Sequence, residues 1–265
     1  MGGGFAVFDI EGPIAHFRCI YSNIAGLSYH FPPRNTLVGI LAAILGLERE
    51  GGRYEGYYSL FSRDVCDIAV RIMTPLRKVQ FSINYLDTGS RGIVEKSKIK
   101  GLGPRKQIPL EYVIAKDSSK NVRYRVYVRH SDEDLVKLLV ERIQANRPAY
   151  PVSLGPAYCL ASIQLIEENV EIEEADGNQL YHVITVMPQS RVNIIYEQID
   201  RLQRSGQSLK IVLEERLPPD FGPYRRPVPN TGDNYYFEEN GKPVPVKIIA
   251  PTQILRIGDF YGVFM

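Results

Sequence analysis

The residues best suited to chemistry in this chain are cations, and they are concentrated between positions 71 and 130. This window holds fourteen Lys or Arg residues and only four acids, a formal charge of +10, whereas the whole chain carries +2. Such segregation creates a local field whose natural partner is a polyanion. A solvated basic loop is the alternative interpretation.

A second group of candidate binding residues precedes the first predicted helix. His16, Arg18 and Tyr29 lie in the loop at 16–30, and Arg34 lies at the helix N-terminus, where free amides and the helix dipole favour phosphate. Cations would follow a sugar–phosphate backbone while Tyr and His rings take bases. Ordinary packing remains open for His16 and Tyr29, and a plain surface position for Arg34.

The alternating segment 123–129 adds three arginines that would share one face of a strand, namely Arg123, Arg125 and Arg129. A polyanion would neutralise them. Salt bridges to acids in the C-terminal part of the chain would also explain them, and both interpretations stay open.

Signatures of enzymes and cofactor sites are missing. The chain contains no GxxxxGK[ST], HExxH or GxSxG motif. The stretch at 101–106 begins like a dinucleotide loop but lacks the third glycine. The four histidines are scattered, and the six acids at 167–176 are more typical of a solvated surface than of a Mg²⁺ site. We therefore expect no cofactor and no metal.

Cysteine usage and hydropathy indicate the compartment. Cys19, Cys66 and Cys159 are widely spaced and form no CxxC pair, which indicates buried thiols in a reducing environment. The longest apolar run, 37–47, is too short to cross a bilayer. The sequence predicts a cytoplasmic protein that does not enter a membrane.

Periodicity predicts the elements that must position these residues. Strands are expected at 5–10, 67–73, 124–128 and 157–166. One helix is expected at 37–45, capped by Asn35 or Thr36 and ended by Gly46, and a second helix is expected behind a capping box at Ser131.

The basic window interrupts this series with a predicted hairpin arm, whose strands are expected at 77–86 and 109–115 around a basic excursion at 87–107. The resulting order is β-α-β-(hairpin)-β-α-β. It predicts an α+β class and a modified ferredoxin-like, or RNA-recognition-motif-like, domain over 1–170, with a basic β-hairpin insertion at about 77–122.

The remaining segment, 171–265, predicts a smaller and mostly β C-terminal region. Short strands are expected at 181–187, 209–213, 244–249 and 253–257. The acidic run at 167–176 is interpreted as a solvated hairpin tip or linker. The segment 190–204 fits a helix or a poorly paired strand, and the pattern does not decide between them.

Several segments together resemble a known family. Residues 12–18 (GPIAHFR) and 28–46 (SYHFPPRNTLVGILAAILG) resemble the fifth family of CRISPR-associated (Cas) proteins, within the RAMP superfamily. Further short matches to its type I members are PLRK at 75–78, INY at 83–85, PLE at 109–111, YRVYV at 124–128 and SLG at 153–155. The resemblance covers about residues 5 to 165.

The resemblance implies a subunit of a type I interference complex in antiviral defence. Such a subunit holds the 5′ handle of the crRNA, caps the filament of backbone subunits and contacts the large subunit, so that it meets target DNA only indirectly. The inserted hairpin would be the thumb that presses on the crRNA. The residues that would bind RNA are His16, Arg18, Tyr29, Arg34, Arg77, Lys78, Arg91, Lys96, Lys98, Lys100, Arg105, Lys106, Arg123 and Arg125.

One branch of this family cleaves precursor crRNA without metal, using a Tyr at the end of the first helix and a Lys-His pair around the second. Here Leu45 takes the first position, and His130 is followed by Ser131 with no Lys-His pair. We therefore expect no catalytic residue. A metal-independent endoribonuclease using Tyr29, His16 or His130 as acid or base is the alternative, and a protein-only scaffold is a third possibility.

Overall fold

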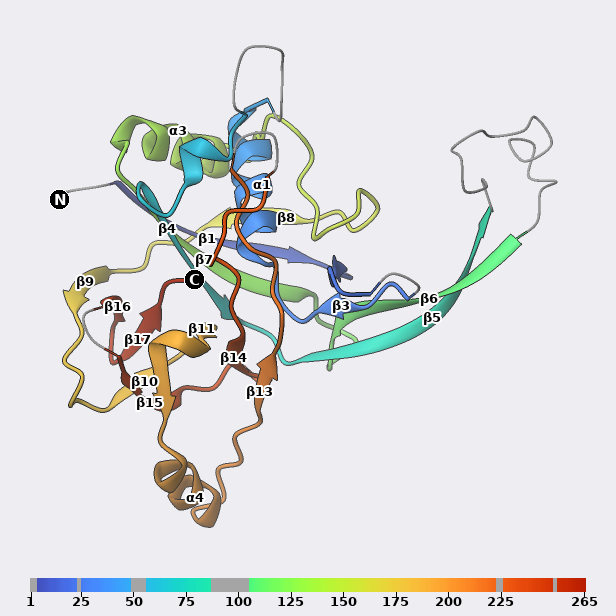
Figure 1. Cartoon of the computed structure of the whole chain (residues 1–265). Coiled ribbons are helices and arrows are strands. Elements are labelled where there is room, and N and C mark those ends of the chain that lie inside the picture. Colours follow the sequence, from blue (N-terminus) through green and yellow to red (C-terminus); the bar gives the residue numbers. More distant parts are fainter. Residues whose placement is uncertain (1–3, 23–24, 49–55, 87–104, 223–225, 250–251) are drawn as a thin grey trace.

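A four-stranded antiparallel sheet forms the centre of the N-terminal part. The computed structural model describes residues 4–22, 25–48, 56–86, 105–222, 226–249 and 252–265. The central sheet has the order β4-β7-β1-β8, formed by β1 (Gly4–Gly12), β4 (Cys66–Ile72), β7 (Val122–His130) and β8 (Ser162–Leu165). Helices α1 (Arg34–Leu45) and α3 (Glu133–Gln144) cover one face of this sheet (Figure 1). The chain is mixed α and β, with few helices and many strands.

The apolar pattern of the strands explains how the sheet is sandwiched. Phe8 and Ile10 of β1 point into a core that contains Leu37 and Leu41 of α1. The alternate residue Val7 points to the opposite face, where it packs in a second core with residues of the C-terminal part. Both faces of the central strands are therefore buried along part of their length.

The ends of both helices differ in detail from the prediction. Helix α1 begins at Arg34 after Pro33, and no side chain caps it. Asn35 instead binds the C-terminal part, because its amide donates to the carbonyl of Pro219 and its Oδ1 accepts from the amide of Phe221. Gly46 ends the helix as predicted, with φ of 78°.

Helix α3 starts one residue later than predicted. Asp132, not Ser131, is the N-cap, and its carboxylate accepts from the amides of Asp134 and Leu135. The buried side chains of the helix are Val136, Leu139 and Ile143. Leu138 of the same helix is exposed.

The C-terminal part consists of two further sheets. A six-stranded sheet has the order β12-β15-β10-β17-β16-β9. Its strands are β9 (Val170–Glu174), β10 (Tyr181–Val183), β12 (Val192–Ile194), β15 (Val244–Ile248), β16 (Gln253–Ile257) and β17 (Phe260–Val263). A three-stranded sheet, β11-β14-β13, is formed by β11 (Met187–Pro188), β13 (Ile211–Glu214) and β14 (Tyr235–Glu238).

Three expectations for the chain after α3 can be compared with the structure. The acidic run contains strand β9, which pairs with β16, and is not a hairpin tip or linker. The undecided segment contains the 3₁₀ turn η2 (Gln189–Arg191), strand β12 and helix α4 (Tyr196–Arg204). The strand expected at 157–166 begins only at Ser162, because Cys159 closes a turn by donating its amide to the carbonyl of Pro156.

The N- and C-terminal parts share hydrophobic cores. Val186, Leu217 and Phe237 belong to the same core as α1 and the central sheet. The amide of Val186 also donates to the carbonyl of Val70 on the outer edge of β4, at 2.8 Å. The boundary expected after residue 170 falls at the start of β9, whose first residue is Val170, and the segments on either side of it are packed together (Figure 1).

The inserted hairpin is a long two-stranded arm that extends away from the body (Figure 1). Its strands are β5 (Leu76–Leu86) and β6 (Arg105–Ala115), paired antiparallel from Leu76↔Ala115 to Leu86↔Arg105. Body strands β2 (Phe17–Arg18) and β3 (Ser28–Tyr29) lie beside its root, where Ala15 and Gly26 bridge to β6. A short 3₁₀ turn, η1 (Ser59–Phe61), precedes β4.

The arm root is also attached to the C-terminal part. The amide of Leu76 donates to the carbonyl of Glu239 at 3.2 Å. The ammonium group of Lys116 donates to Oδ1 of Asn240 at 2.8 Å and lies 3.4 Å from the Glu239 carboxylate. Both ends of the hairpin therefore hold the same turn. In the described residues, no helix has the length and apolarity needed to cross a membrane.

Candidate nucleic-acid interface

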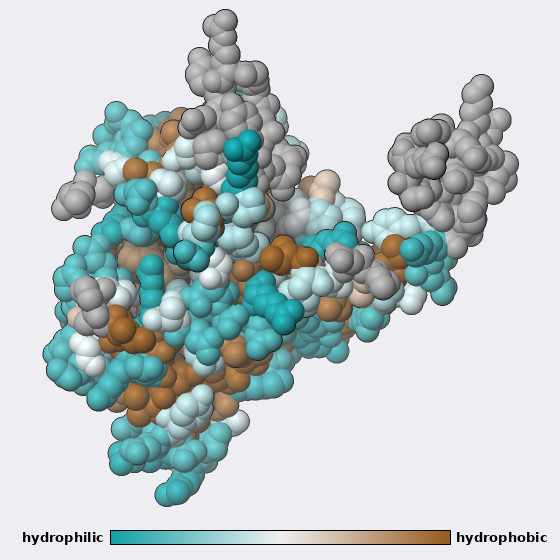
Figure 2. Space-filling view, in the orientation of Figure 1, coloured by the Kyte–Doolittle hydropathy of each residue, from teal (hydrophilic) through white to brown (hydrophobic). Residues whose placement is uncertain are grey.

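The arm has one apolar and one polar face. Directly opposed residues of an antiparallel pair share a face, and the pairs Phe81↔Leu110, Ile83↔Ile108 and Tyr85↔Lys106 lie on the same side. The other side carries Lys78, Gln80, Ser82, Asn84, Gln107 and Glu111. Phe81 and Tyr85 remain 56% and 45% exposed. Hydrophobic residues can be seen along the arm in Figure 2.

A groove of about 610 Å³ lies where this apolar face meets the body. The arm contributes Tyr85, Ile108 and Leu110, and a turn of the body contributes Gly155, Pro156 and Tyr158. The remaining wall comes from the β2–β3 region and the start of α1, with His16, Phe17, Arg18, Gly26 and Thr36. Its volume lies within the range of small-molecule sites.

The turn at Gly155 closes one end of the groove. Gly155 has φ of 110°, and a Cβ at this position would lie 1.9 Å from the carbonyl oxygen of His16. Only glycine allows the turn to approach this close. The backbone of His16 is therefore pressed against the turn that carries Tyr158.

His16 is held in one tautomer at the groove wall. Its Nδ1 lies 2.7 Å from the carbonyl oxygen of Glu111, which can only accept, so Nδ1 donates. Burial lowers the pKa of His16, and the charge of Arg18 lowers it further, although the bond to the Glu111 carbonyl acts in the opposite direction. The net shift is downward, and the ring is neutral at neutral pH.

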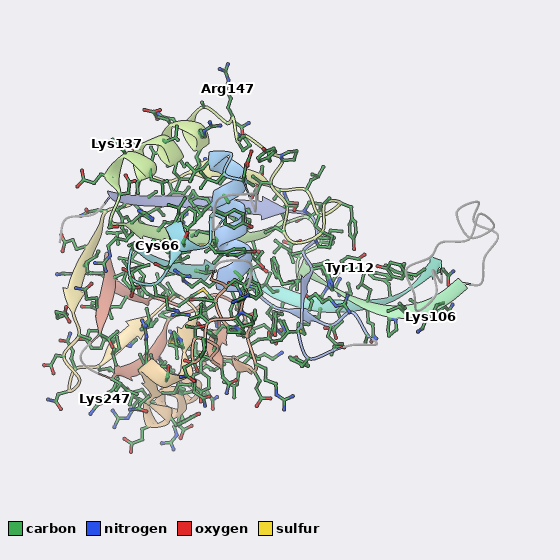
Figure 3. All side chains as sticks on the ribbon, turned by 45° about the horizontal axis from the view of Figure 1, so that its top comes forward. Cys66, Lys106, Tyr112, Lys137, Arg147 and Lys247 are labelled. Atoms are coloured by element: carbon green, nitrogen blue, oxygen red, sulfur yellow. The ribbon has the colours of Figure 1, made fainter. Side chains whose placement is uncertain are left out.

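Aromatic rings connect the arm to the body. Tyr112 lies on β6 between the body and Lys106, the labelled residue further along the arm (Figure 3). Its ring lies 6.0 Å from that of His16, 6.1 Å from Phe81 and 6.3 Å from Tyr158. The Tyr112 hydroxyl also donates to the Tyr158 hydroxyl at 3.2 Å. These contacts hold the rings in place while Tyr158 remains 57% exposed.

The predicted cations on and beside the arm differ in availability. Arg18, Arg77 and Lys106 are exposed, and none has an ion-pair partner in the part of the chain that the structure describes. Lys78 is half-buried, with Nζ 3.9 Å from Glu111 and 3.8 Å from Glu214. Arg105 lies in β6, but its side chain is outside the described structure, as are Arg91, Lys96, Lys98 and Lys100.

Two predicted binding residues lie in the interior instead. Tyr29 is fully buried, and its hydroxyl donates to the carbonyl of Arg216 at 2.5 Å. Arg34 is 6% exposed, donates to the carbonyls of Phe61 and Cys66, and lies 3.3 Å from Asp220. Neither side chain reaches the groove.

The arginines of β7 lie on one face, as predicted, and are paired with acids. Arg125 binds Asp9 at 2.7 Å and Glu168 at 3.1 Å, and Arg123 lies 3.1 Å from Glu11. Arg129 binds Asp67. The salt-bridge interpretation therefore holds, but the principal partners lie on the neighbouring strands β1 and β4, and only Glu168 comes from the acidic run.

A family model places this architecture among known proteins. The model described as CRISPR-associated protein (Cas_Cas5) matches residues 5–228. The chain belongs to this family. No curated protein matches it by sequence.

Solved structures add a similarity of fold. The chain resembles the crystal structure of a CRISPR protein from Archaeoglobus fulgidus with a TM-score of 0.51 and 11% identity, over 98% of each chain. It also matches a chain of a structure titled CRISPR RNA-guided surveillance complex, with a TM-score of 0.45 and 11% identity, over 92% of this chain and 91% of that one. The first similarity supports a shared fold.

In this Cas family member, most of the side chains considered as general acids or bases are hydrogen-bonded to backbone groups. His130 is 4% exposed, and its Nε2 donates to the carbonyl of Leu60 at 2.7 Å while Nδ1 accepts from the amide of Asp132. Leu45, at the end of α1, is buried. No group of three His, Cys, Asp or Glu side chains is arranged to hold a metal ion among the described residues.

A buried His–Glu pair near the arm root was not predicted. Nδ1 of His30 lies 2.5 Å from Oε2 of Glu214, whose other oxygen lies 3.8 Å from Lys78. Burial by itself raises the pKa of Glu214, but the hydrogen bonds and charge of His30 and the charge of Lys78 lower it below its usual value. The pair joins β13 to the arm and to the segment before α1.

The tyrosines that line the groove of this family member were not predicted from the sequence either. Tyr85 and Phe81 share the face of a predicted strand, and this spacing was a signal that could have identified them. Tyr158 lies in an irregular turn, where no periodicity indicates the direction of its side chain. Tyr112 was recognisable as part of a strand, but its contact with Tyr158 depends on the tertiary fold.

Proposed function

We propose that this chain is a non-catalytic RNA-binding subunit of a type I CRISPR interference complex, which holds the 5′ handle of the crRNA and caps the filament of backbone subunits. The observation that carries the proposal is the groove at the arm root, where exposed rings of Tyr85 and Tyr158 lie beside Arg18, a cation with no acidic partner among the described residues. Rings that stack on bases beside cations that bind phosphate are the usual means of binding single-stranded RNA.

In this proposal, the central sheet is a modified ferredoxin-like domain and the β5–β6 arm is its thumb. The sheet order β4-β7-β1-β8, with a helix after β1 and after β7, supports this description. The arm would contact the neighbouring backbone subunit as well as the crRNA. The large subunit would be a second protein partner, and target DNA would be met only through the assembled complex.

We further propose that the protein binds the RNA without cleaving it. Of the side chains considered as acid or base, the Tyr29 hydroxyl and both ring nitrogens of His130 are hydrogen-bonded to backbone groups. His16 faces the groove, and the other titratable side chains of its described lining are Arg18, Tyr85 and Tyr158. Burial and the hydrogen bond with Tyr112 raise the pKa of the Tyr158 hydroxyl, which makes it a poor partner for the two proton transfers of RNA cleavage.

The test uses the purified full chain and repeat-derived RNA across a salt series, with and without EDTA, followed by gel analysis of the RNA. We expect binding that weakens steeply with salt, because counterions are released from phosphates, and RNA of unchanged length. Cleavage of the RNA in the presence of EDTA would contradict this proposal and would instead support a metal-independent endoribonuclease. An absence of RNA affinity, alone and with the backbone subunit present, would leave only a protein scaffold.

A further inference from the structure

We propose that the groove at the arm root is a slot for one unpaired nucleobase, and that Nε2 of His16 accepts a hydrogen bond from an N–H group of that base. This inference rests on the proposed RNA-binding function and adds to it a defined ligand, a base-reading residue and a stacking residue.

The free nitrogen of His16 is the starting point. Because Nδ1 donates to the Glu111 carbonyl, Nε2 carries the lone pair of the neutral ring. Nε2 has no hydrogen-bond partner in the described part of the chain, and it is not among the polar atoms sealed from solvent. His16 is otherwise 6% exposed and lines the groove, so this acceptor faces the groove.

The walls of the groove fit a flat aromatic ligand. Tyr85 and Tyr158 offer exposed rings, and Ile108, Leu110 and Pro156 add apolar surface. The contact between the hydroxyls of Tyr112 and Tyr158 holds the second ring in position before any ligand arrives. Every nucleobase has a π-face that can stack on such a ring.

The charge of the groove favours a nucleotide over other aromatic ligands. Arg18 lies at its rim, exposed and without an acidic partner among the described residues. None of the described residues that line the groove is an acid. A phosphate attached to the stacked base would therefore meet a cation and no carboxylate of the described lining, whereas an aromatic side chain of a protein would leave Arg18 unused. The nearby Glu111 carboxylate accepts from the amide of Ser28 and lies 3.9 Å from Lys78.

The experiment separates the hydrogen bond from stacking. Two pairs of single-stranded RNA decamers serve as probes: uridine against N3-methyluridine, and adenosine against N6,N6-dimethyladenosine. In each pair the second member keeps the ring and lacks the N–H donor. A decamer of abasic sites keeps only the backbone. Fluorescence anisotropy measures the dissociation constants with the full-length protein.

For the pair whose parent binds more tightly, we expect the methylated RNA to bind about fivefold more weakly, the size of one neutral hydrogen bond. His16→Asn should abolish this difference, because the Asn amide can still donate to the Glu111 carbonyl but offers no acceptor at the position of Nε2. Tyr158→Leu should instead reduce the preference for methylated over abasic RNA, which we expect to be about tenfold.

His182→Asn is the matched control, because His182 is exposed on β10 of the C-terminal sheet and should change nothing. Thermal melting of each variant verifies its fold. If His16→Asn keeps the full N–H preference, or lowers affinity for the abasic decamer equally, the slot is wrong while RNA binding stands. If the wild-type protein binds no decamer, with or without the backbone subunit, the slot and the proposed function both fail.

Discussion

The cations of the arm and those of the body come from neighbouring stretches of sequence but have different environments. Arg77 and Lys106 on the arm face solvent with no acid beside them among the described residues. Arg123 and Arg125 on β7 lie against Glu11 and Asp9. A count of charges along the chain gives these four residues equal weight, although of the four only Arg77 and Lys106 lack an acidic partner among the described residues.

Strand register produces this difference. On β7, Arg123 is directly opposite Glu11 and Arg125 opposite Asp9, so that each cation meets a carboxylate across the ladder. On the arm, Arg77 is opposite Ile114 and Lys106 opposite Tyr85. Cross-strand partners therefore determine which part of a basic segment is structural and which part is available for binding.

The largest expected effect tests the body cations. Arg34→Met should destabilise the fold by about 3–5 kcal/mol, because it leaves Asp220 with one cation fewer and the carbonyls of Phe61 and Cys66 without their donor. Arg77→Met is the matched control on the arm and should change stability by less than about 0.5 kcal/mol. Urea unfolding of both variants measures the difference, and equal losses would remove the distinction between the two regions.

The next effect tests the exposed cations. Replacing Arg18, Arg77 and Lys106 together with Gln should weaken RNA binding more than about tenfold at low salt and reduce the salt slope by about 2, because three phosphate contacts on a single strand are lost. Stability should not change, since none of the three has an ion-pair partner among the described residues.

Arg123→Gln provides the comparison for this variant, because Arg123 is partly exposed but already paired with Glu11. It should change RNA affinity less than about twofold. The comparison fails if Arg123→Gln weakens binding as much as the triple variant, because the paired arginines would then contact RNA as well. Anisotropy titrations at several salt concentrations measure both quantities.

The smallest effect concerns Lys78, the arm cation that the body neutralises through Glu214. Because the folded-state pKa of Glu214 lies below its usual value of 4.5, the charged carboxylate stabilises the fold above the unfolded-state pKa. This contribution is lost as pH falls through the lower folded-state pKa. Glu214→Gln should therefore be less stable than wild type at pH 7, by about 1 kcal/mol.

Urea unfolding at pH 7, 5, 4 and 3 measures this linkage. The difference between wild type and Glu214→Gln should be present at pH 7 and 5 and should shrink towards zero at lower pH as the wild-type carboxylate takes up its proton. A difference that stays constant down to pH 3 would mean that Glu214 acts through shape and not through charge.

Local patterns were sufficient to predict most of the central sheet and the arm. Alternation identified β1, β4 and β7 to within a few residues, because each of these strands has at least one face buried against a continuous core. The arm strands, expected at 77–86 and 109–115, are β5 (Leu76–Leu86) and β6 (Arg105–Ala115). Gly46 ended α1 as predicted because its backbone is left-handed. The cap of α1 was wrong because Asn35 is used by a segment near Pro219, far away in sequence.

The candidate site was harder to predict, because its members depend on tertiary neighbours. Arg34 and Tyr29 are polar residues in a loop-rich stretch. Nothing in the local sequence indicates that Arg34 donates hydrogen bonds to the carbonyls of Phe61 and Cys66, or that the Tyr29 hydroxyl donates to the carbonyl of Arg216. The groove itself lies between the arm, the β2–β3 region and the Gly155 turn, three segments that approach one another only in the folded chain. Of the basic excursion expected at 87–107, residues 87–104 lie outside the described residues, and residues 105–107 belong to strand β6.

The attachment of the arm root to the turn at Glu239 and Asn240 has a consequence for how the molecule is made. Synthesis proceeds from the N-terminus, and N-terminal segments generally fold first. Leu76 and Lys116 leave the ribosome long before the turn that they bind. A nascent chain that has completed both arm strands can therefore pair the arm root with Ala15 and Gly26, but it still lacks the contacts with the turn at Glu239 and Asn240. The arm is therefore synthesised early, but the contacts that fix its orientation are completed only after the C-terminal part has been made.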